Sequence, residues 1–375
     1  MELTNFISNT KKSNNIEKRK TLNYIAFIKF VAMIKIIKWH IYSWKKRKFD
    51  YGARMCEFLF IASGFLVGYN HYKRNMLCDY ETSFNYSYKH LRTFYPLECF
   101  NIIYGFYRKH QSKFNLTKLE ILLSNFLLIK TWSRHTNLAQ YFTGISWFLS
   151  DLLFCYFLVP LLLKGIKQLK SSLILFFIVS ITRISIEEII RNGSANLFDA
   201  DFHRGPFIRL LEFYLGMLLI PTFFLIKNNL DKYTKNFWIK MVFTFIQISF
   251  PIISYNIMLK YNDKLYRCYF VLIFCVFIFI ISYDYGLLSN IFAHKFCAKI
   301  MSCQMEMYLI QNTMNNIIHE FKKKMKISFI LNSEMKFLIK LLIIFVFGYL
   351  YKQLLKEKLA RLLDKIIFNC KKIFF

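Results

Sequence analysis

The stretch FWIKMVFTFIQISFPIISYNIML, residues 237–259, holds a single charged residue, Lys240. A helix needs about 20 predominantly apolar residues to cross a hydrocarbon core of about 30 Å. Similar windows are SSLILFFIVSITRISIEEII (171–190), YFVLIFCVFIFIISY (269–283) and FLIKLLIIFVFGYLY (337–351). Strands cross a membrane only as closed barrels, and no alternating ten-residue pattern repeats here. The sequence therefore predicts an all-α fold, a polytopic helical bundle in a membrane.

The number of spans follows from the apolar segments and the charges around them. Both ends are basic, with KKSNNIEKRK at 11–20 and KEKLARLLDKIIFNCKK at 356–372, so the positive-inside rule predicts that both termini are cytoplasmic. This requires an even number of spans. The weakest segment, 118–131, is expected to be interfacial or re-entrant, which leaves about ten. The eleven apolar segments lie near 24–44, 54–70, 93–107, 118–131, 146–164, 171–190, 206–226, 237–258, 265–283, 304–320 and 336–353.

The predicted organisation is simple. We expect a basic cytoplasmic segment at 1–21, one transmembrane domain at 22–355 and a basic cytoplasmic tail at 356–375, with no cleaved signal peptide. The expected location is the cell membrane, that is the inner or cytoplasmic membrane.

The composition limits the partners. The formal net charge of +30 fits an anionic ligand or lipid surface, and equally the ordinary basic loops of a membrane protein. The lysines do not gather into one domain and no nucleic-acid motif occurs, so we expect membrane lipid and no nucleic acid as a partner. Nine cysteines are scattered without a CxxC pair, which predicts no metal site and no disulfide framework.

The first apolar segment contains KFVAMIKIIKWHIYSW, residues 29–44, with ionisable residues at membrane depth. Lys29 and His40 are eleven residues apart, so on a helix they share one face at about 16 Å along the axis. Ionisable groups inside a membrane usually face a cavity or a partner. The alternative is that the lysines extend to the interface and His40 lies at the far one.

The second apolar segment, ARMCEFLFIASGFLVGYNHYKR (53–74), carries Glu57 and then Ser63-Gly64-Phe65. A buried glutamate near His40 would orient the imidazole or balance its charge. The Ser-Gly pair also fits close packing of two membrane helices.

Polar residues recur in four later segments. They are Arg92, Tyr95 and Pro96 in KHLRTFYPLE (89–98); Trp147, Ser150 and Asp151 in GISWFLSDLLFCYFLVP (144–160); Arg204, Arg209 and Gly216 in HRGPFIRLLEFYLGML (203–218); and Ser302, Tyr308 and Gln311 in KIMSCQMEMYLIQN (299–312).

In this order the motifs resemble the membrane acyltransferase-3 family, over about residues 22–350. The spacing of a basic residue and a histidine in the first span, matched by Lys29 and His40, and the acidic residue followed by Ser-Gly-Phe are the specific features. Two positions depart from the family pattern. Lys29 stands where arginine is common, and Gln311 stands where many members have a histidine.

The resemblance implies an O-acyltransferase that uses acetyl-CoA or another acyl-CoA as donor, with a carbohydrate hydroxyl as acceptor. A neutral imidazole removes a proton from an alcohol near pH 7, so His40 is the expected base, with Glu57 as its orienting residue. Lys29 and Arg92 are expected to contact phosphates of the coenzyme. Ser63, Tyr95, Trp147, Ser150, Asp151 and Arg209 are further candidates for substrate contacts or structural roles.

Other functions stay open at this point. A multi-pass transporter or flippase for a polar or anionic substrate would also carry ionisable residues at membrane depth, although no internal repeat is visible.

The segments 132–144 and 192–205, rich in aromatic and polar residues, are the expected outward-facing acceptor loops.

Overall fold

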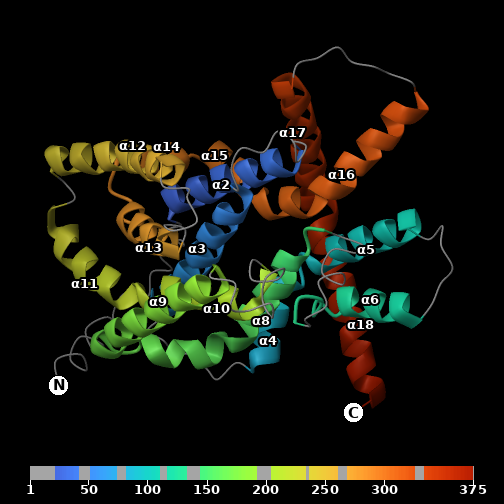
Figure 1. Ribbon diagram of the computed structural model, residues 1–375, viewed down its shortest axis with the longest axis horizontal. Helices are drawn as coiled ribbons and strands as arrows, with labels where there is room; N and C mark the ends of the chain where they lie inside the picture. Colours follow the sequence, from blue (N-terminus) through green and yellow to red (C-terminus); the bar gives the residue numbers. More distant parts are fainter. Residues whose placement is uncertain are drawn as a thin grey trace.

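The computed structural model describes residues 22–41, 51–73, 82–109, 116–132, 144–191, 204–233, 236–260, 268–325 and 333–374. Within these ranges the regular elements are all helices and no strand occurs, which confirms the all-α prediction. The α-helices, labelled in Figure 1, are α2 (Asn23–Ile41), α3 (Tyr51–Lys73), α4 (Ser83–Leu91), α5 (Tyr95–Lys109), α6 (Leu116–Phe126), α8 (Trp147–Leu162), α9 (Leu169–Arg191), α10 (Pro206–Leu218), α11 (Ile220–Leu230), α12 (Phe237–Lys260), α13 (Phe270–Ile281), α14 (Leu287–Phe292), α15 (Lys295–Met301), α16 (Gln304–Lys324), α17 (Ser333–Leu350) and α18 (Lys356–Phe374).

Five helical segments in the described part of the chain are long and apolar enough to cross a membrane. They are Trp147–Ile166, Leu169–Ile189, Pro206–Tyr233, Phe237–Met258 and Ser333–Ile366. The count of about ten spans therefore stays a prediction. The weak segment at 118–131 forms α6, whose 11 residues make a helix of about 16 Å, too short to cross the hydrocarbon core.

Helix α2 packs against α3 and against α14, α15, α16 and α17, near the middle of the bundle (Figure 1). Its first backbone N–H groups are capped from a distant part of the chain. The Asp284 carboxylate accepts hydrogen bonds from the N–H of Asn23 at 3.1 Å and of Tyr24 at 3.3 Å. A carboxylate at a helix N-terminus satisfies unpaired donors and complements the helix dipole. This contact fixes the start of α2.

Pro251 explains a second contact of α2. A proline inside a helix has no N–H to donate, so the carbonyl four residues earlier loses its usual partner. In α12 that carbonyl belongs to Gln247, and it accepts a hydrogen bond from the Tyr24 hydroxyl. The Gln247 side chain in turn donates to the Ser289 hydroxyl at 2.7 Å. The break in α12 is thus used to join α12 to α2 and α14.

Helix α3 is buried on all sides between Cys56 and Ala62, and its most extensive contact is with α10. Two glycines make that contact reciprocal. A Cβ on Gly64 would lie 1.8 Å from the Phe213 carbonyl oxygen, and one on Gly216 would lie 1.9 Å from the Ile61 carbonyl oxygen. The two backbones therefore touch where side chains would normally separate them, as small residues permit in membrane helices.

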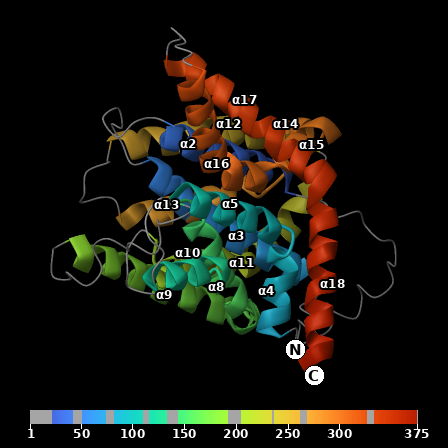
Figure 2. The same cartoon turned by 90° about the vertical axis from the view of Figure 1, so that its right-hand side faces the viewer.

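The C-terminal helices form one long rod along one side of the bundle, in which the π-helical turn Tyr351–Leu355 joins α17 to α18 (Figure 2). Lys356 binds the buried Glu306 of α16 at 2.7 Å. Further along α18, Asp364 accepts a hydrogen bond from Tyr88 at 2.6 Å and pairs with Arg92. The predicted tail is therefore helical up to Phe374 and packed on α4, α5 and α16 over its first half.

Replacing Gly64 or Gly216 by alanine should lower thermal stability in detergent. Each added methyl meets a backbone carbonyl that cannot rotate away, and overpacking of this kind costs about 1–3 kcal/mol or more. The matched control is Gly144→Ala, whose methyl would lie 3.6 Å from the Asn312 amide nitrogen, an ordinary contact. Equal unfolding midpoints for all three variants would contradict the close α3–α10 contact.

Candidate active site

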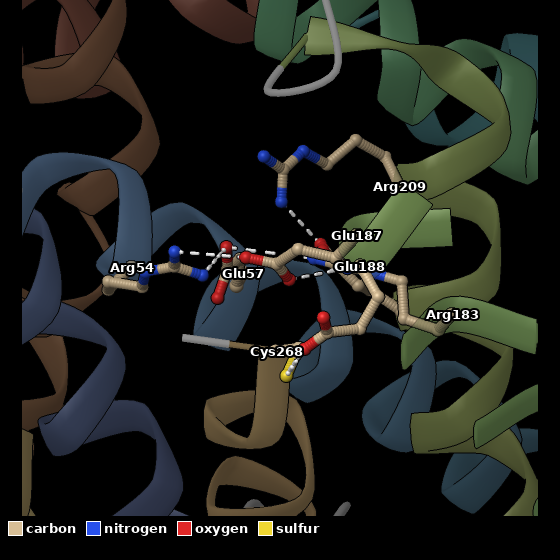
Figure 3. A network of polar contacts seen from close by, with 8 residues as sticks. Arg54, Glu57, Arg183, Glu187, Glu188, Arg209 and Cys268 are labelled. Atoms are coloured by element: carbon tan, nitrogen blue, oxygen red, sulfur yellow. Dashed lines mark hydrogen bonds and ion pairs between the residues drawn. The ribbon is translucent and has the colours of Figure 1, made fainter. Parts of the chain in front are cut away.

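Three helices bring six charged side chains together inside the bundle; Figure 3 labels Arg54, Glu57, Arg183, Glu187 and Arg209 among them. Each helix contributes one arginine and one glutamate, spaced three or four residues apart so that both lie on the same helix face. The six charges sum to zero. They are Arg54 and Glu57 of α3, Arg183 and Glu187 of α9, and Arg209 and Glu212 of α10.

The ion pairs connect the three helices. One oxygen of Glu212 accepts from Nε and Nη2 of Arg183 at 3.1 and 2.8 Å, and the other accepts from Arg209. Glu187 binds Arg183 at 2.8 Å and Arg54 at 3.2 Å. Glu57 binds Arg54 at 2.5 Å and lies 3.7 Å from Arg183.

The centre of the network is removed from solvent, since the side chains of Arg183 and Glu212 are fully buried, while those of Arg54 and Glu187 are 13% exposed. A buried charge is costly unless it is paired and hydrogen-bonded, so a balanced cluster has to form as a whole. Beside it, the Cys268 thiol donates to Glu188 at 3.1 Å, which extends the polar contacts to the start of α13 (Figure 3).

Arg209 also connects the network to an aromatic cluster. Its guanidinium lies over the rings of Phe60 and Trp147, with centroids at 5.6 and 5.7 Å. Phe60 in turn packs on Phe148, and Phe148 packs edge-on against Tyr308 of α16. Two residues selected from the sequence, Trp147 and Arg209, are thus in direct contact.

Ser150 and Asp151 belong to a second polar cluster, formed with the turn after α6. The Thr131 hydroxyl donates to Asp151 at 2.6 Å and contacts the Ser150 hydroxyl at 2.8 Å. Both residues are fully buried, and the second carboxylate oxygen of Asp151 has no hydrogen-bond partner. In the same turn Leu128 adopts a φ of 57°, a conformation that is unusual for a branched side chain.

Lys130 is the cation of this second cluster. Its amine is buried and contacts the Asn125 side chain at 3.2 Å and the Ser146 hydroxyl. Burial lowers the pKa of Lys130 to about 8, because removal from water disfavours the charged amine. Lys130 lies in the apolar segment 118–131, and nothing in the local sequence predicts that its amine is buried.

The helices α2 and α3 run antiparallel, and two contacts fix their register. The Lys29 amine donates to the Ser63 hydroxyl at 3.4 Å, and the Trp39 ring covers Gly52. On α2 the half-buried Lys29 and His40 share a face with the buried residues Ile25, Met33 and Ile36. The predicted shared face is therefore directed into the bundle, and the Lys29–Ser63 contact joins the two most specific sequence motifs.

The sequence predicted that Glu57 pairs with His40, but the structure pairs Glu57 with two arginines instead. In the register of the hairpin Glu57 is level with residues 34 and 35 of α2, about 8 Å along the axis from His40. Its hydrogen bonds and ion pairs go to Arg54 and Arg183. The physical reason is that two guanidinium groups lie nearer, one of them a single turn away on the same helix. His40 packs its ring against Trp39.

The other selected residues lie elsewhere. Arg92 is one-third exposed and bound to Asp364, while the Tyr95 hydroxyl donates to the Phe126 carbonyl at 2.8 Å. The segments 133–143 and 192–203, which hold most of the expected acceptor loops, lie outside the described residues.

Tyr308 and Gln311, both noted in the sequence, belong to a longer polar face of α16. Gln304, Tyr308, Gln311 and Asn315 follow the spacing i, i+4, i+7, i+11, which is one face of a helix. Buried amide atoms of Gln304, Gln311 and Asn315 have no hydrogen-bond partner, and Gln311 is fully buried with neither amide atom paired. Such groups are costly inside a protein unless water or a ligand binds them. The periodicity was readable in the sequence, but not the absence of partners.

A comparison with protein families gives a match that covers nearly the whole chain. The model of the acyltransferase-3 family, described as an acyltransferase domain, matches residues 22–352. The chain belongs to the acyltransferase-3 family. No curated protein and no solved structure gives a significant match.

Family membership makes the chain a membrane acyltransferase, and the match contains both polar clusters, the α2–α3 hairpin and the α16 face. Among the described residues no group of histidine, cysteine, aspartate and glutamate side chains has the arrangement of a metal site. The acyltransferase thus presents hydroxyl, amide, imidazole and basic groups around α2, α3, α8 and α16.

We expect Arg183→Met alone to destabilise the acyltransferase by about 3–5 kcal/mol, because it leaves Glu187 and Glu212 short of a buried partner. Arg183→Met combined with Glu187→Met should cost less than the single change. The double variant keeps two complete pairs, Arg54–Glu57 and Arg209–Glu212.

Unfolding in detergent measures both variants, with Arg108→Met as the control. Arg108 pairs at 2.9 Å with Glu320 on the exposed surface, where a pair contributes about 0–1 kcal/mol. A double variant less stable than Arg183→Met would contradict a network held by charge balance.

Proposed function

We propose that the protein is an integral-membrane O-acyltransferase that moves an acyl group, with acetyl the preferred one, from acyl-CoA to a hydroxyl of a cell-surface glycan or its precursor. The observation that carries the proposal is the position of Lys29 and His40 within the family match. They lie on the inward face of α2, and Lys29 contacts the Ser63 hydroxyl of α3.

The donor would lie along α2. Lys29 would meet a phosphate of the coenzyme, since a partly desolvated ammonium binds phosphate through charge-assisted hydrogen bonds. The axial distance of about 16 Å from Lys29 to His40 then leaves room for an extended pantetheine arm, with the thioester near His40. Arg92 would supply a second phosphate contact only by exchanging its present partner, Asp364.

The chemistry requires one base. The neutral His40 imidazole would remove the proton of the acceptor hydroxyl as its oxygen attacks the thioester carbonyl. The tetrahedral intermediate would then collapse, breaking the carbon–sulfur bond, and the imidazolium would return the proton to the departing thiolate. The products are the ester and CoA, and no covalent acyl-enzyme is needed.

Glu57 has a different task in this scheme from the one that its spacing suggests. Bound to Arg54 and Arg183, it would hold α3 in place and so position Ser63 opposite Lys29. The unpaired amides of the α16 face would bind hydroxyl or amide groups of the acceptor or donor, which would supply their missing partners.

His40→Ala should abolish transfer in a protein that still folds, because the acceptor hydroxyl loses its base. The measurement is mass spectrometry of surface glycans from cells with the intact gene, without it, and with the variant. The ester should be present only with the intact gene. The exposed His319→Ala serves as control and should retain it. Native ester levels in cells that carry a normally inserted His40→Ala protein would remove His40 as the base.

Lys29→Ala should raise the KM for acyl-CoA about tenfold or more, the effect of losing one charge-assisted hydrogen bond, with little change in the KM for the acceptor. Lys29→Arg should lie closer to the native value because the positive charge is kept. The exposed Lys232→Ala controls for a general loss of positive charge. Equal KM values for acyl-CoA in the native and Lys29→Ala proteins would count against a phosphate at this position.

A further inference from the structure

An apolar groove lies between α2, α3, α12 and α13, and it is partly open to the surroundings of the protein. Its volume is about 120 Å³. The floor is formed by Ile28 of α2, Phe58 of α3, Pro251 of α12, and Phe274 and Phe277 of α13. A dry apolar cavity of similar size in other proteins binds a small hydrocarbon, so a segment of hydrocarbon chain fits here.

This groove is separate from the proposed catalytic face. Lys35, which lines it, lies about 120–140° around α2 from Lys29 and His40. A ligand in the groove would therefore touch α2 on another side and would not compete with the donor. Binding in this groove is independent of the proposed function.

The groove is lined almost entirely by apolar atoms, and its polar residues come from α2 and α12. Lys35 is exposed, with its amine 5.3 Å from the centroid of the Tyr255 ring, and Ser254 also lines the groove. Among the described residues no carboxylate pairs with Lys35, whereas Lys38, one turn further on, binds Glu334 at 2.9 Å. A lysine amine exposed on the side of a membrane helix is costly unless it reaches the interface or an anion.

Lys35 and Tyr255 both lie near the C-terminal ends of their helices. The contacts Tyr24–Gln247 and Lys35–Tyr255 show that α2 and α12 run parallel. Lys35 is six residues from the end of α2 at Ile41, about 9 Å, and Tyr255 is five residues from the end of α12 at Lys260. A lysine side chain covers most of such a distance, so its amine can meet a headgroup that lies at the ends of α2 and α12.

We propose that the groove binds a phospholipid with an anionic headgroup, its hydrocarbon tail along Ile28 and Phe274 and its phosphate at Lys35. The described residues that line the groove include one cation, Lys35, and no carboxylate. They can therefore pair with the phosphate of an anionic headgroup, but they offer nothing to the positive group of a zwitterionic one. Helix α12 gives a structural reason for a bound tail. Only 11% of its spanning window is buried inside the protein. A tail in the groove would therefore add apolar contacts between α12 and the rest of the bundle.

Native mass spectrometry of the full chain in detergent tests the proposal, with phosphatidylglycerol and phosphatidylcholine of identical tails as probes. The native protein should retain phosphatidylglycerol several-fold better. Lys35→Ala should make the two lipids equal. Val31→Trp, which fills the groove from α2, should lower retention of both lipids, with folding checked by thermal unfolding.

The matched control is Lys299→Ala. Lys299 is an exposed lysine over the Tyr349 ring at 5.2 Å, and it does not line the groove. It should leave the preference for phosphatidylglycerol intact. Equal retention of the two lipids by the native protein would overturn the proposal. So would a preference that survives Lys35→Ala, or one that Lys299→Ala lowers as much as Lys35→Ala does.

Discussion

The balance of six charges between α3, α9 and α10 is the constraint on which the rest of the structure depends. Arg183 and Glu212 are fully buried, so neither tolerates the loss of its partner. Their pairing fixes α9 against α10 and, through Arg54 and Glu57, fixes α3 against both. The backbones of α3 and α10 touch at Gly64 and Gly216, and this contact agrees with the helix positions that the ion pairs set.

The position of α2 follows from that of α3. The hairpin register sets Lys29 on Ser63, Asp284 caps the first turn, and Tyr24 binds the carbonyl released by Pro251. Three separate parts of the chain therefore hold one helix that carries three lysines and a histidine. The inward face holds Lys29, which contacts Ser63 of α3, and His40, whereas Lys35 lies on the side that lines the apolar groove.

What the sequence predicted correctly was local. Apolar windows identify helices, and the spacing of Lys29 and His40 defines a shared face because helix geometry is fixed within a segment. The i, i+3 spacing of Arg54 and Glu57 makes their pairing readable in the sequence, whereas the contact of Glu57 with Arg183 was not predictable, since Arg183 is more than a hundred residues away. The α6 turn with Lys130 was missed for the same reason. Short helices such as α14 and α15 blur the span count, because a periodic apolar pattern does not fix where a helix ends.

The central claim is that one face of α2 carries the donor at Lys29 and the chemistry at His40. An experimental structure of the protein with a thioether analogue of acetyl-CoA, which cannot transfer its acyl group, tests this most directly. The account predicts a coenzyme phosphate in contact with the Lys29 amine and the acyl carbonyl beside the His40 imidazole. A coenzyme bound away from α2, or one bound with its acyl end far from His40, would contradict it.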